Sequence, residues 1–212
     1  MPGGWFRQDM TTSLTALAIS CTLKASPADS STDLLATQVL DALAEHGVAG
    51  ELVRAADSTI SPGVEADMGG DDEWPALRAK VLAADILVLA TPTWMGQHSS
   101  IAQRVLERLD AELSETDAEG RPHLFDKVAI AAVVGNEDGA HHIAAILFQS
   151  LDDIGYTIPA QGSVYWNGEA MQTVDYKDLD ETPEKVASAT STAARNAAHL
   201  AGLLQERAYP AE

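Results

Sequence analysis

The densest group of side chains that could bind a ligand lies between residues 20 and 32, just before a predicted helix. This first segment combines hydroxyl groups with one cation. Those groups, together with the free N–H donors of a helix start, are what a phosphate monoester requires. A second explanation stays open, because we expect Ser31 or Thr32 to cap the helix in any case. The candidate phosphate-binding residues are Thr22, Lys24, Ser30, Ser31 and Thr32.

Two common nucleotide-binding motifs are absent from the sequence. It contains neither the G-x-x-x-x-G-K-[ST] loop nor the G-x-G-x-x-G fingerprint. These absences argue against nucleoside triphosphate chemistry and against a tightly held dinucleotide.

A second segment with ligand-binding character follows the apolar run at residues 86–90. That run has the length and branching of a strand covered on both faces, so the segment lies at the carboxyl end of a strand. Ligands gather at that edge of open parallel sheets, and an aromatic side chain beside a glycine favours a flat heteroaromatic ligand. The alternative is that the tryptophan folds back onto the core. The residues are Pro92, Thr93, Trp94, Met95 and Gly96.

The third segment joins a predicted strand to a helix that begins with Ala140, and a glycine stands at each of its ends. Backbone donors there could hold a carbonyl or a partly anionic edge of a ring. The acids of this segment also have a simpler use, since carboxylates stabilise the first turn of a helix. The neighbouring His141 and His142 point to different sides of that helix, so we predict no metal site. The residues are Gly135, Asn136, Glu137, Asp138 and Gly139.

Strands and helices alternate along the chain, which predicts a single α/β domain over residues 1–212 with a doubly wound sheet of five parallel strands. Residues 1–12 are expected to be a flexible N-terminus, and residues 57–72 a loop or lid. Pro159 places the last strand toward an edge of the sheet. The expected strands cover residues 14–20, 50–54, 86–90, 127–134 and 156–165, and the expected helices cover residues 33–46, 74–83, 99–113, 140–154 and 182–207.

The composition limits which binding partners and which cellular compartment we expect for this protein. The chain carries 13 Lys and Arg against 32 Asp and Glu, a formal charge of -19, which argues against nucleic acid and anionic membranes as partners. That charge serves solubility, although it could also steer a basic redox partner. No apolar run approaches about 20 residues, and residues 1–10 lack the hydrophobic centre of a signal peptide. Cys21 is the sole cysteine, so we expect a reducing cytoplasm and a small apolar role for this thiol.

The order of elements and the three segments resemble the flavodoxin-like superfold, and within it the NAD(P)H-dependent FMN reductase and quinone reductase branch. The first loop of that branch reads G-S-x-R and then G-S-N-T, to which residues 21–24 and 30–32 are similar, and its second loop, T-P-x-Y-x-G, resembles residues 91–96 closely. The chain departs from the family pattern at Cys21, Lys24 and Trp94, which stand in place of Gly, Arg and Tyr. Because lysine lacks the bidentate phosphate contacts of arginine, the resemblance implies loosely held FMN.

The resemblance further implies a three-layer α/β/α fold with strand order 2-1-3-4-5 and an enzyme whose chemistry belongs to FMN. Hydride would pass from NAD(P)H through FMN to a quinone or similar small acceptor, with no catalytic side chain. The first segment would bind the FMN phosphate, and the other two would frame the isoalloxazine ring. His141, His142 or Tyr165 could protonate an acceptor.

Members of this branch also form homodimers or homotetramers, and residues 57–72 and 163–180 are candidate contacts. The apolar Trp166, Met171 and Tyr176 fit such an interface, or packing over the sheet edge. Two other functions remain open. One is an electron carrier of the flavodoxin type for a protein partner, and the other is a flavodoxin-like protein without a cofactor that serves binding or regulation.

Overall fold

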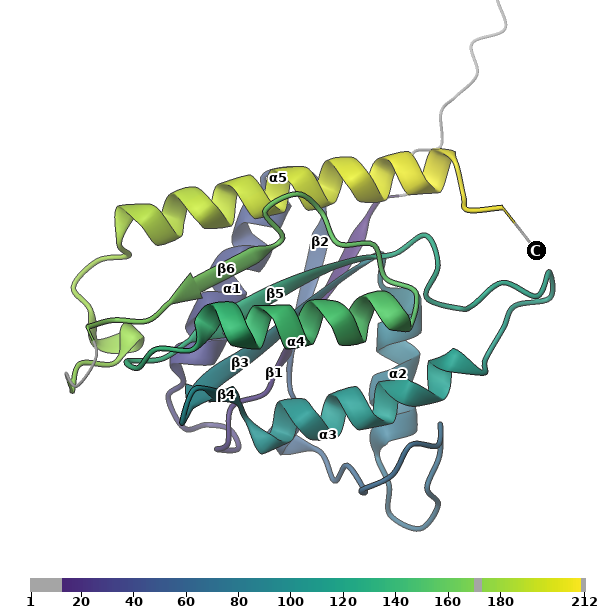
Figure 1. The fold of residues 1–212 in the computed structure, drawn as a ribbon, viewed down its shortest axis with the longest axis horizontal. Helices are drawn as coiled ribbons and strands as arrows, with labels where there is room; N and C mark the ends of the chain where they lie inside the picture. Colours follow the sequence, from purple (N-terminus) through teal and green to yellow (C-terminus); the bar gives the residue numbers. More distant parts are fainter. Residues whose placement is uncertain (1–12, 170–172, 211–212) are drawn as a thin grey trace, which may run out of the picture.

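The structure, a computed structural model, describes residues 13–169 and 173–210. Its sheet contains five parallel strands in the order β2-β1-β3-β5-β6, with a short β4 paired antiparallel to β3 (Figure 1). Counted along the parallel strands alone, this is the expected 2-1-3-4-5 order, so the predicted doubly wound sheet is confirmed. The strands are β1 (Thr15–Ser20), β2 (Ala49–Arg54), β3 (Ile86–Trp94), β4 (Gln97–His98), β5 (Val128–Val134) and β6 (Ser163–Trp166).

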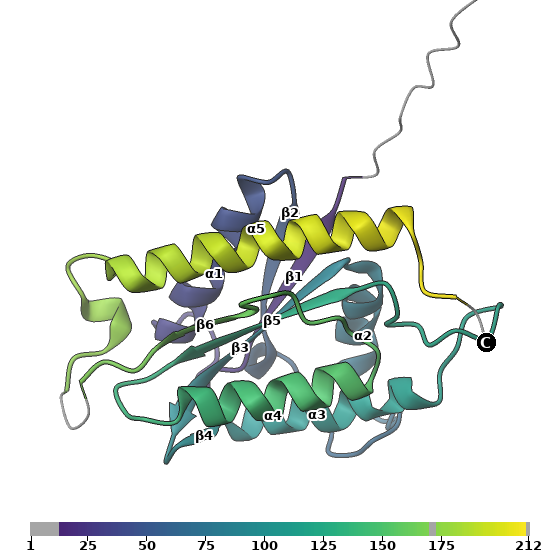
Figure 2. The same cartoon turned by 45° about the horizontal axis from the view of Figure 1, so that its top comes forward.

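Helices cover both faces of this sheet and produce three layers (Figures 1 and 2). One face packs against α1 (Ser31–Ala44) and α5 (Glu184–Glu206). The other packs against α2 (Trp74–Ala83), α3 (Ser100–Leu109) and α4 (Ala140–Asp153). Among the helices of residues 13–169 and 173–210, none is long and apolar enough to cross a bilayer.

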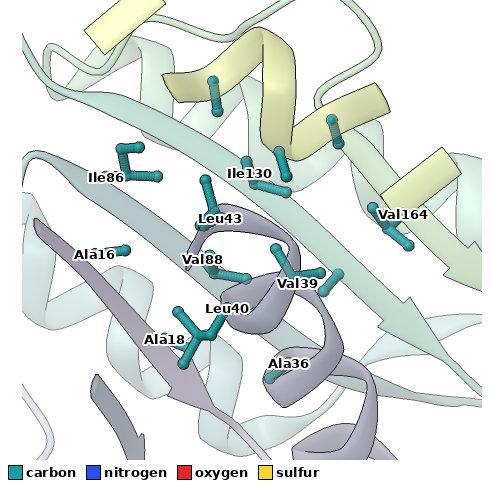
Figure 3. Close-up of a cluster of buried hydrophobic side chains, with 14 of the residues drawn as sticks. Ala16, Ala18, Ala36, Val39, Leu40, Leu43, Ile86, Val88, Ile130 and Val164 are labelled. Atoms are coloured by element: carbon teal, nitrogen blue, oxygen red, sulfur yellow. The ribbon is translucent and has the colours of Figure 1, made fainter. Parts of the chain in front are cut away.

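Both faces of the central strands are buried, which explains why they are apolar runs rather than alternating patterns. In β3, Val88 faces α1 and α5, while its neighbours Leu87 and Leu89 face the opposite helix layer. Figure 3 shows Val39, Leu40 and Leu43 of α1 packed toward the sheet. Because β1, β3 and β5 are paired in parallel, their carboxyl ends lie at the same edge of the sheet.

The start of α1 differs from the prediction. Ser30 is the N-cap, because its Oγ accepts a hydrogen bond from the Asp33 N–H at 3.2 Å. The expectation that Ser31 or Thr32 caps the helix is therefore wrong, and both lie inside its first turn. The helix also ends at Ala44 rather than at residue 46, where a turn leads to Gly47.

Two strands also differ from their predicted extents. β3 continues through Trp94, so the turn of the second segment is only Met95 and Gly96, both at positive φ, before β4 returns. The last strand covers only residues 163–166, because Pro159 accepts a bond from the Gly162 N–H and makes a turn within residues 156–165. The predicted helix at residues 99–113 is α-helical only as far as Leu109, and a 3₁₀ turn, Asp110–Leu113, follows it. All other helix and strand ends lie within two residues of the prediction.

Residues 57–72, the arginine-anchored loop, are held by a buried ion pair. The Arg108 Nη1 atom lies 2.8 Å from the Asp72 Oδ2 atom, and neither side chain is exposed to solvent. Arg108 also donates to the carbonyls of Ser61 and Glu65, and Asp72 accepts from the N–H groups of Ser61 and Met68. Of the two predicted descriptions, loop and lid, these contacts support a fixed loop.

Candidate functional site

A cavity of about 390 Å³ opens at the carboxyl ends of β1, β3, β5 and β6. All three predicted segments contribute to its lining, so the convergence expected from the sequence is present. A fourth stretch, after β6, also lines it. The lining residues are Thr22, Leu23, Lys24, Asp29, Ser30, Ser31, Thr32, Pro92, Thr93, Trp94, Val134, Gly135, Asn136, Trp166, Asp175, Tyr176 and Lys177.

The backbone of the first segment is held from outside the cavity. Arg54, at the end of β2, donates to the Lys24 carbonyl at 3.1 Å and pairs with the carboxylate of Asp33. The Ser26 N–H and hydroxyl both donate to Asp57, at 2.6 and 2.7 Å. Asp57 consequently has a pKa below its ordinary value, first through the Ser26 hydroxyl and then through the Ser26 N–H. These contacts position the loop without using the side chains of Thr22, Lys24 and Thr32, although the Ser30 hydroxyl caps α1.

Three side chains of the first segment remain available to a ligand. Within residues 13–169 and 173–210, the hydroxyls of Thr22 and Thr32 and the ammonium of Lys24 have no hydrogen-bond partner. They lie beside the first turn of α1, whose N-terminal N–H groups favour an anion. This end of the cavity is suited to a phosphate.

The β3–β4 hairpin forms the second wall. Trp94 lines the cavity and is 54% exposed, so its indole does not fold back onto the core. Met95 and Gly96, predicted to bind the same ligand, do not line the cavity. Met95 is at the tip of the hairpin and is 90% exposed. An exposed indole at a cavity wall presents a flat apolar surface to a heteroaromatic ring.

The third segment divides into residues that line the cavity and residues that fix the hairpin. Gly135 and Asn136 line it. Glu137 instead accepts a hydrogen bond from the Met95 N–H at 2.8 Å. Gly139 lies so close to Gly96 that a Cβ atom added to it would stand 2.7 Å from the Gly96 Cα. The predicted binding residues Glu137, Asp138 and Gly139 therefore lie outside the lining.

Asp138 has the simpler use that the sequence also allowed. Its carboxylate accepts from the N–H of Gly139, the residue that precedes α4, at 2.7 Å. Gly135 is needed for a different reason, because a Cβ atom there would stand 2.8 Å from the Cβ of Thr93. The close approach of β3 and the third segment thus requires a glycine.

The wall that sequence reasoning missed is the cavity-wall segment, residues 173–183, which contains the short 3₁₀ turn η3 (Tyr176–Asp178). Tyr176 is buried, its ring centroid lies 5.4 Å from that of Trp166, and its hydroxyl donates to Gln38 at 2.6 Å. The apolar character of Trp166 and Tyr176 was the available signal. It is explained by packing within the chain, while Met171 lies outside the described residues.

Lys177 adds a second cation to the cavity. Its backbone N–H donates to the Ser31 Oγ atom at 3.2 Å, which ties the cavity-wall segment to the first segment. Its ammonium lies 2.8 Å from Asp178, and this hydrogen bond, with smaller contributions from the charges of Asp178, Asp175 and Asp29, raises the pKa of Lys177. The ammonium therefore stays protonated at neutral pH.

The remaining titratable candidates do not line the cavity. The His141 Nε2 atom lies 2.9 Å from the Tyr165 hydroxyl, and the His142 Nε2 atom lies 3.1 Å from the Gln97 side-chain oxygen. Burial raises the pKa of the Cys21 thiol, which disfavours a reactive thiolate. In the part of the chain that the structure describes, no group of three His, Cys, Asp or Glu residues could hold a metal ion.

The cavity therefore offers the two ends that FMN requires. Hydroxyls and lysines beside a helix start fit its phosphate, and the exposed indole of Trp94 fits its ring. Two carboxylates, Asp29 and Asp175, also line the cavity and reduce its positive charge. The one buried titratable side chain among the described lining residues, Tyr176, donates its hydroxyl proton to Gln38.

Comparison with known proteins identifies relatives across most of the chain. The family model described as NADPH-dependent FMN reductase matches residues 15–171. The 8-demethyl-8-aminoriboflavin-5'-phosphate synthase of Streptomyces davaonensis is 32% identical over 207 residues, which cover 92% of this chain and 80% of the synthase. The divalent metal cation transporter MntH of Mycobacterium bovis is 43% identical over 169 residues, which cover 78% of this chain. That match spans only 25% of the transporter's length.

Solved structures agree with these matches. RosB with bound 8-demethyl-8-formylriboflavin-5'-phosphate superposes with a TM-score of 0.83 at 32% identity, covering 92% of this chain and 82% of RosB. A flavodoxin from Streptococcus pneumoniae superposes with a TM-score of 0.55 at 14% identity, covering 88% of this chain and 98% of the flavodoxin. The second likeness concerns the fold alone, and it confirms the flavodoxin-like architecture.

Proposed function

The chain belongs to the NADPH-dependent FMN reductase family and is a flavin-dependent oxidoreductase. From this premise we propose that it passes hydride from NAD(P)H through FMN to a quinone or similar small acceptor. The observation that carries the proposal is the cavity itself. It combines Lys24 and the hydroxyls of Thr22 and Thr32, which have no partner in the described part of the chain, with the exposed indole of Trp94 at the other end.

Each wall has a separate task in this proposal. Thr22, Lys24 and the residues at the start of α1 bind the phosphate and so anchor the cofactor. Trp94 packs against the isoalloxazine ring, and Glu137 keeps the hairpin that carries it in place through the Met95 N–H. FMN supplies the hydride chemistry when bound, so the chain's contribution is to position the reactants and exclude water.

The visible spectrum of the purified protein, recorded before and after addition of FMN, tests binding. The double variant Thr22→Ala, Lys24→Ala should weaken FMN binding more than tenfold, because hydrogen bonds to a charged group contribute ~1.5–3 kcal/mol each. Lys80→Ala is the matched control, since it removes a cation that pairs with Glu51 and does not line the cavity. Unchanged FMN affinity in the double variant would refute the phosphate assignment.

Stopped-flow mixing of the FMN-loaded protein with NADPH tests the reaction. Rapid bleaching of the flavin, followed by its reoxidation with a quinone, supports the reductase. A stabilised semiquinone supports the electron carrier instead, and a failure to take up FMN supports the cofactor-free binding protein.

A second function fits the same cavity, namely chemical alteration of a flavin phosphate as the substrate. It is favoured by the likeness to the 8-demethyl-8-aminoriboflavin-5'-phosphate synthase, which extends over 92% of this chain. The mass of the flavin released after reaction separates the two functions. A reductase returns FMN of unchanged mass, whereas an enzyme of the second kind returns a flavin of different mass.

We also propose that the protein forms a homodimer or homotetramer. Supporting this, the Met95 side chain is 90% exposed beside the cavity, where a neighbouring subunit could cover it. Light scattering after size exclusion tests the assembly, and Met95→Glu should weaken it because a charge would be buried at the contact. A monomeric wild-type protein contradicts this proposal.

A further inference from the structure

Two lysines line the cavity, and they belong to different segments of the chain. Lys24 belongs to the first segment, where the family resemblance expects a cation. Lys177 comes from the cavity-wall segment, which lies beyond residues 15–171 matched by the family model. Any role for Lys177 is therefore not explained by the family pattern, and the following inference rests on the proposed function.

Three contacts fix Lys177 beside the first segment. The Tyr176 ring packs against Trp166, and the Tyr176 hydroxyl donates to Gln38 of α1. The Lys177 N–H donates to the Ser31 Oγ atom. The backbone that carries the ammonium is consequently attached to the same helix start that would bind a phosphate.

The hydrogen bond to Ser31 also sets the direction of its hydroxyl. A serine hydroxyl has one proton to donate and lone pairs that accept. Because Ser31 accepts from the Lys177 N–H, its own proton is left for another acceptor, and an anion in the cavity is such an acceptor. The second cation and this donor thus act at the same end of the cavity.

Charge shows why a second lysine matters. The lining contains Asp29 and Asp175 as well as Lys24 and Lys177, so its formal charge is zero with Lys177 and -1 without it. A phosphate carries up to two negative charges, and the whole chain carries -19. With Lys24 as its only cation, the lining would carry a net negative charge and would repel a phosphate.

In the absence of a ligand, Asp178 neutralises Lys177. The two side chains are 30% and 55% exposed, respectively, and an ion pair so open to solvent is weak. A phosphate with several charged oxygens is a stronger partner for the ammonium than one exposed carboxylate.

We propose that Lys177 is a second phosphate-binding cation, for which Asp178 competes, and that it makes the cavity select a flavin phosphate over unphosphorylated riboflavin. Lys177 is then a specificity-determining residue supplied by the cavity-wall segment.

Fluorescence titration of the protein, freed of flavin, with FMN and with riboflavin tests the proposal. Lys177→Ala should weaken FMN binding about tenfold and leave riboflavin binding within about twofold, because only FMN carries the phosphate. Lys177→Arg should restore most of the FMN affinity. Lys185→Ala is the matched control, since this lysine is in the first turn of α5 and lines a different groove. It should change neither affinity.

Asp178→Asn sharpens the test. Removing the competing carboxylate should strengthen FMN binding, and this gain should vanish in the double variant Lys177→Ala, Asp178→Asn. Trp94→Ala provides the opposite pattern, since loss of the ring contact should weaken FMN and riboflavin equally.

The outcomes separate this inference from the proposed function. If the wild-type protein binds neither flavin, both fail. If it prefers FMN and Lys177→Ala keeps that preference, or weakens both flavins equally, only the role of Lys177 is overturned. Urea unfolding of Lys177→Ala should match the wild type, which excludes a collapsed wall as the cause of weaker binding.

Discussion

The arginine-anchored loop and the cavity-wall segment are both polar connections outside the sheet, yet their charges have different partners. In the loop, Arg108 and Asp72 neutralise each other without exposure to solvent. In the cavity-wall segment, Lys177 and Asp175 line a cavity, and Lys177 is paired only with the exposed Asp178 within the described residues. The first arrangement stabilises the fold, whereas the second leaves charge available for a ligand.

The contacts of these two segments also bear on the predicted contacts between subunits. Residues 57–72 and 163–180, which include most of these two segments, were the candidate contacts with a neighbouring subunit, and those contacts stay a prediction. The structure assigns much of each to contacts within the chain, through Arg108 in one case and Tyr176 in the other. What distinguishes them is whether the charged groups are satisfied inside the protein or face a cavity.

The largest expected effect is on stability and comes from Asp72→Ala in the arginine-anchored loop. Loss of this carboxylate leaves the buried Arg108 guanidinium without its ion-pair partner, which costs about 3–5 kcal/mol. Urea unfolding followed by tryptophan fluorescence measures the change. Asp67→Ala is the control, because this exposed side chain accepts only from the Gly69 N–H among the residues that the structure describes. If Asp72→Ala also weakens FMN binding by a similar free energy, the arginine-anchored loop does not act independently of the cavity.

The same carboxylate makes stability depend on pH. Burial acts to raise the pKa of Asp72, but hydrogen bonds from the Met68 N–H, Arg108 and the N–H groups of Ser61 and Trp74 lower it from 3.8 to about 2. A lowered pKa in the folded state gives stability that is present above pH 4 and is lost as the pH falls toward 2.

Unfolding of the wild type and of Asp72→Asn, compared at several pH values, checks this. The stability difference between them should shrink between pH 4 and pH 2, since asparagine does not titrate. A difference that stays constant over this range would rule out Asp72 as the titrating group.

Glycine substitutions should affect the third segment of the cavity and the arginine-anchored loop unequally. Gly139→Ala places a Cβ 2.7 Å from the Gly96 Cα at a φ of +135°, so we expect a loss of about 2–3 kcal/mol and weaker FMN binding as the Trp94 hairpin shifts. Gly69→Ala, in the arginine-anchored loop, meets nothing within 4 Å at a φ of +73°. It should cost about 1–2 kcal/mol and leave FMN binding unchanged. Equal FMN affinities for both variants would contradict this account of the hairpin.

The smallest effect concerns the tyrosine of the cavity wall. Tyr176→Phe keeps the ring against Trp166 but removes the hydrogen bond to Gln38, which should cost about 1 kcal/mol in thermal or urea unfolding. Tyr156→Phe is the comparison, because the Tyr156 hydroxyl is buried without a partner among residues 13–169 and 173–210. Its removal should be neutral or stabilising. A larger loss from Tyr156→Phe than from Tyr176→Phe would reverse the ranking.

Several features of the site were predictable because they depend on residues close together in the sequence. An apolar run followed by a loop identifies the carboxyl end of a parallel strand, and such ends share one edge of a sheet. This placed the first segment, Trp94 and Gly135 at one cavity. It also gave the strand order, once the resemblance to flavodoxin-like proteins was recognised. The roles of these residues in binding FMN stay predictions.

Other features were missed because they join distant residues. Lys177 contacts Ser31 across 146 positions, and Tyr176 contacts Gln38 across 138. No local pattern predicts such a pair. Likewise, the hydrogen bond that the Glu137 carboxylate accepts from the Met95 N–H joins residues 42 positions apart.

Local sequence, then, determined the alternation of strands and helices and the edge at which the loops gather, since apolar periodicity and turn residues act over a few positions. Only the tertiary structure decided which polar groups are consumed within the protein and which face the cavity. That choice depends on how the chain packs, because a charge or hydroxyl is available to a ligand only where it faces the cavity and its contacts within the protein are few or exposed to solvent.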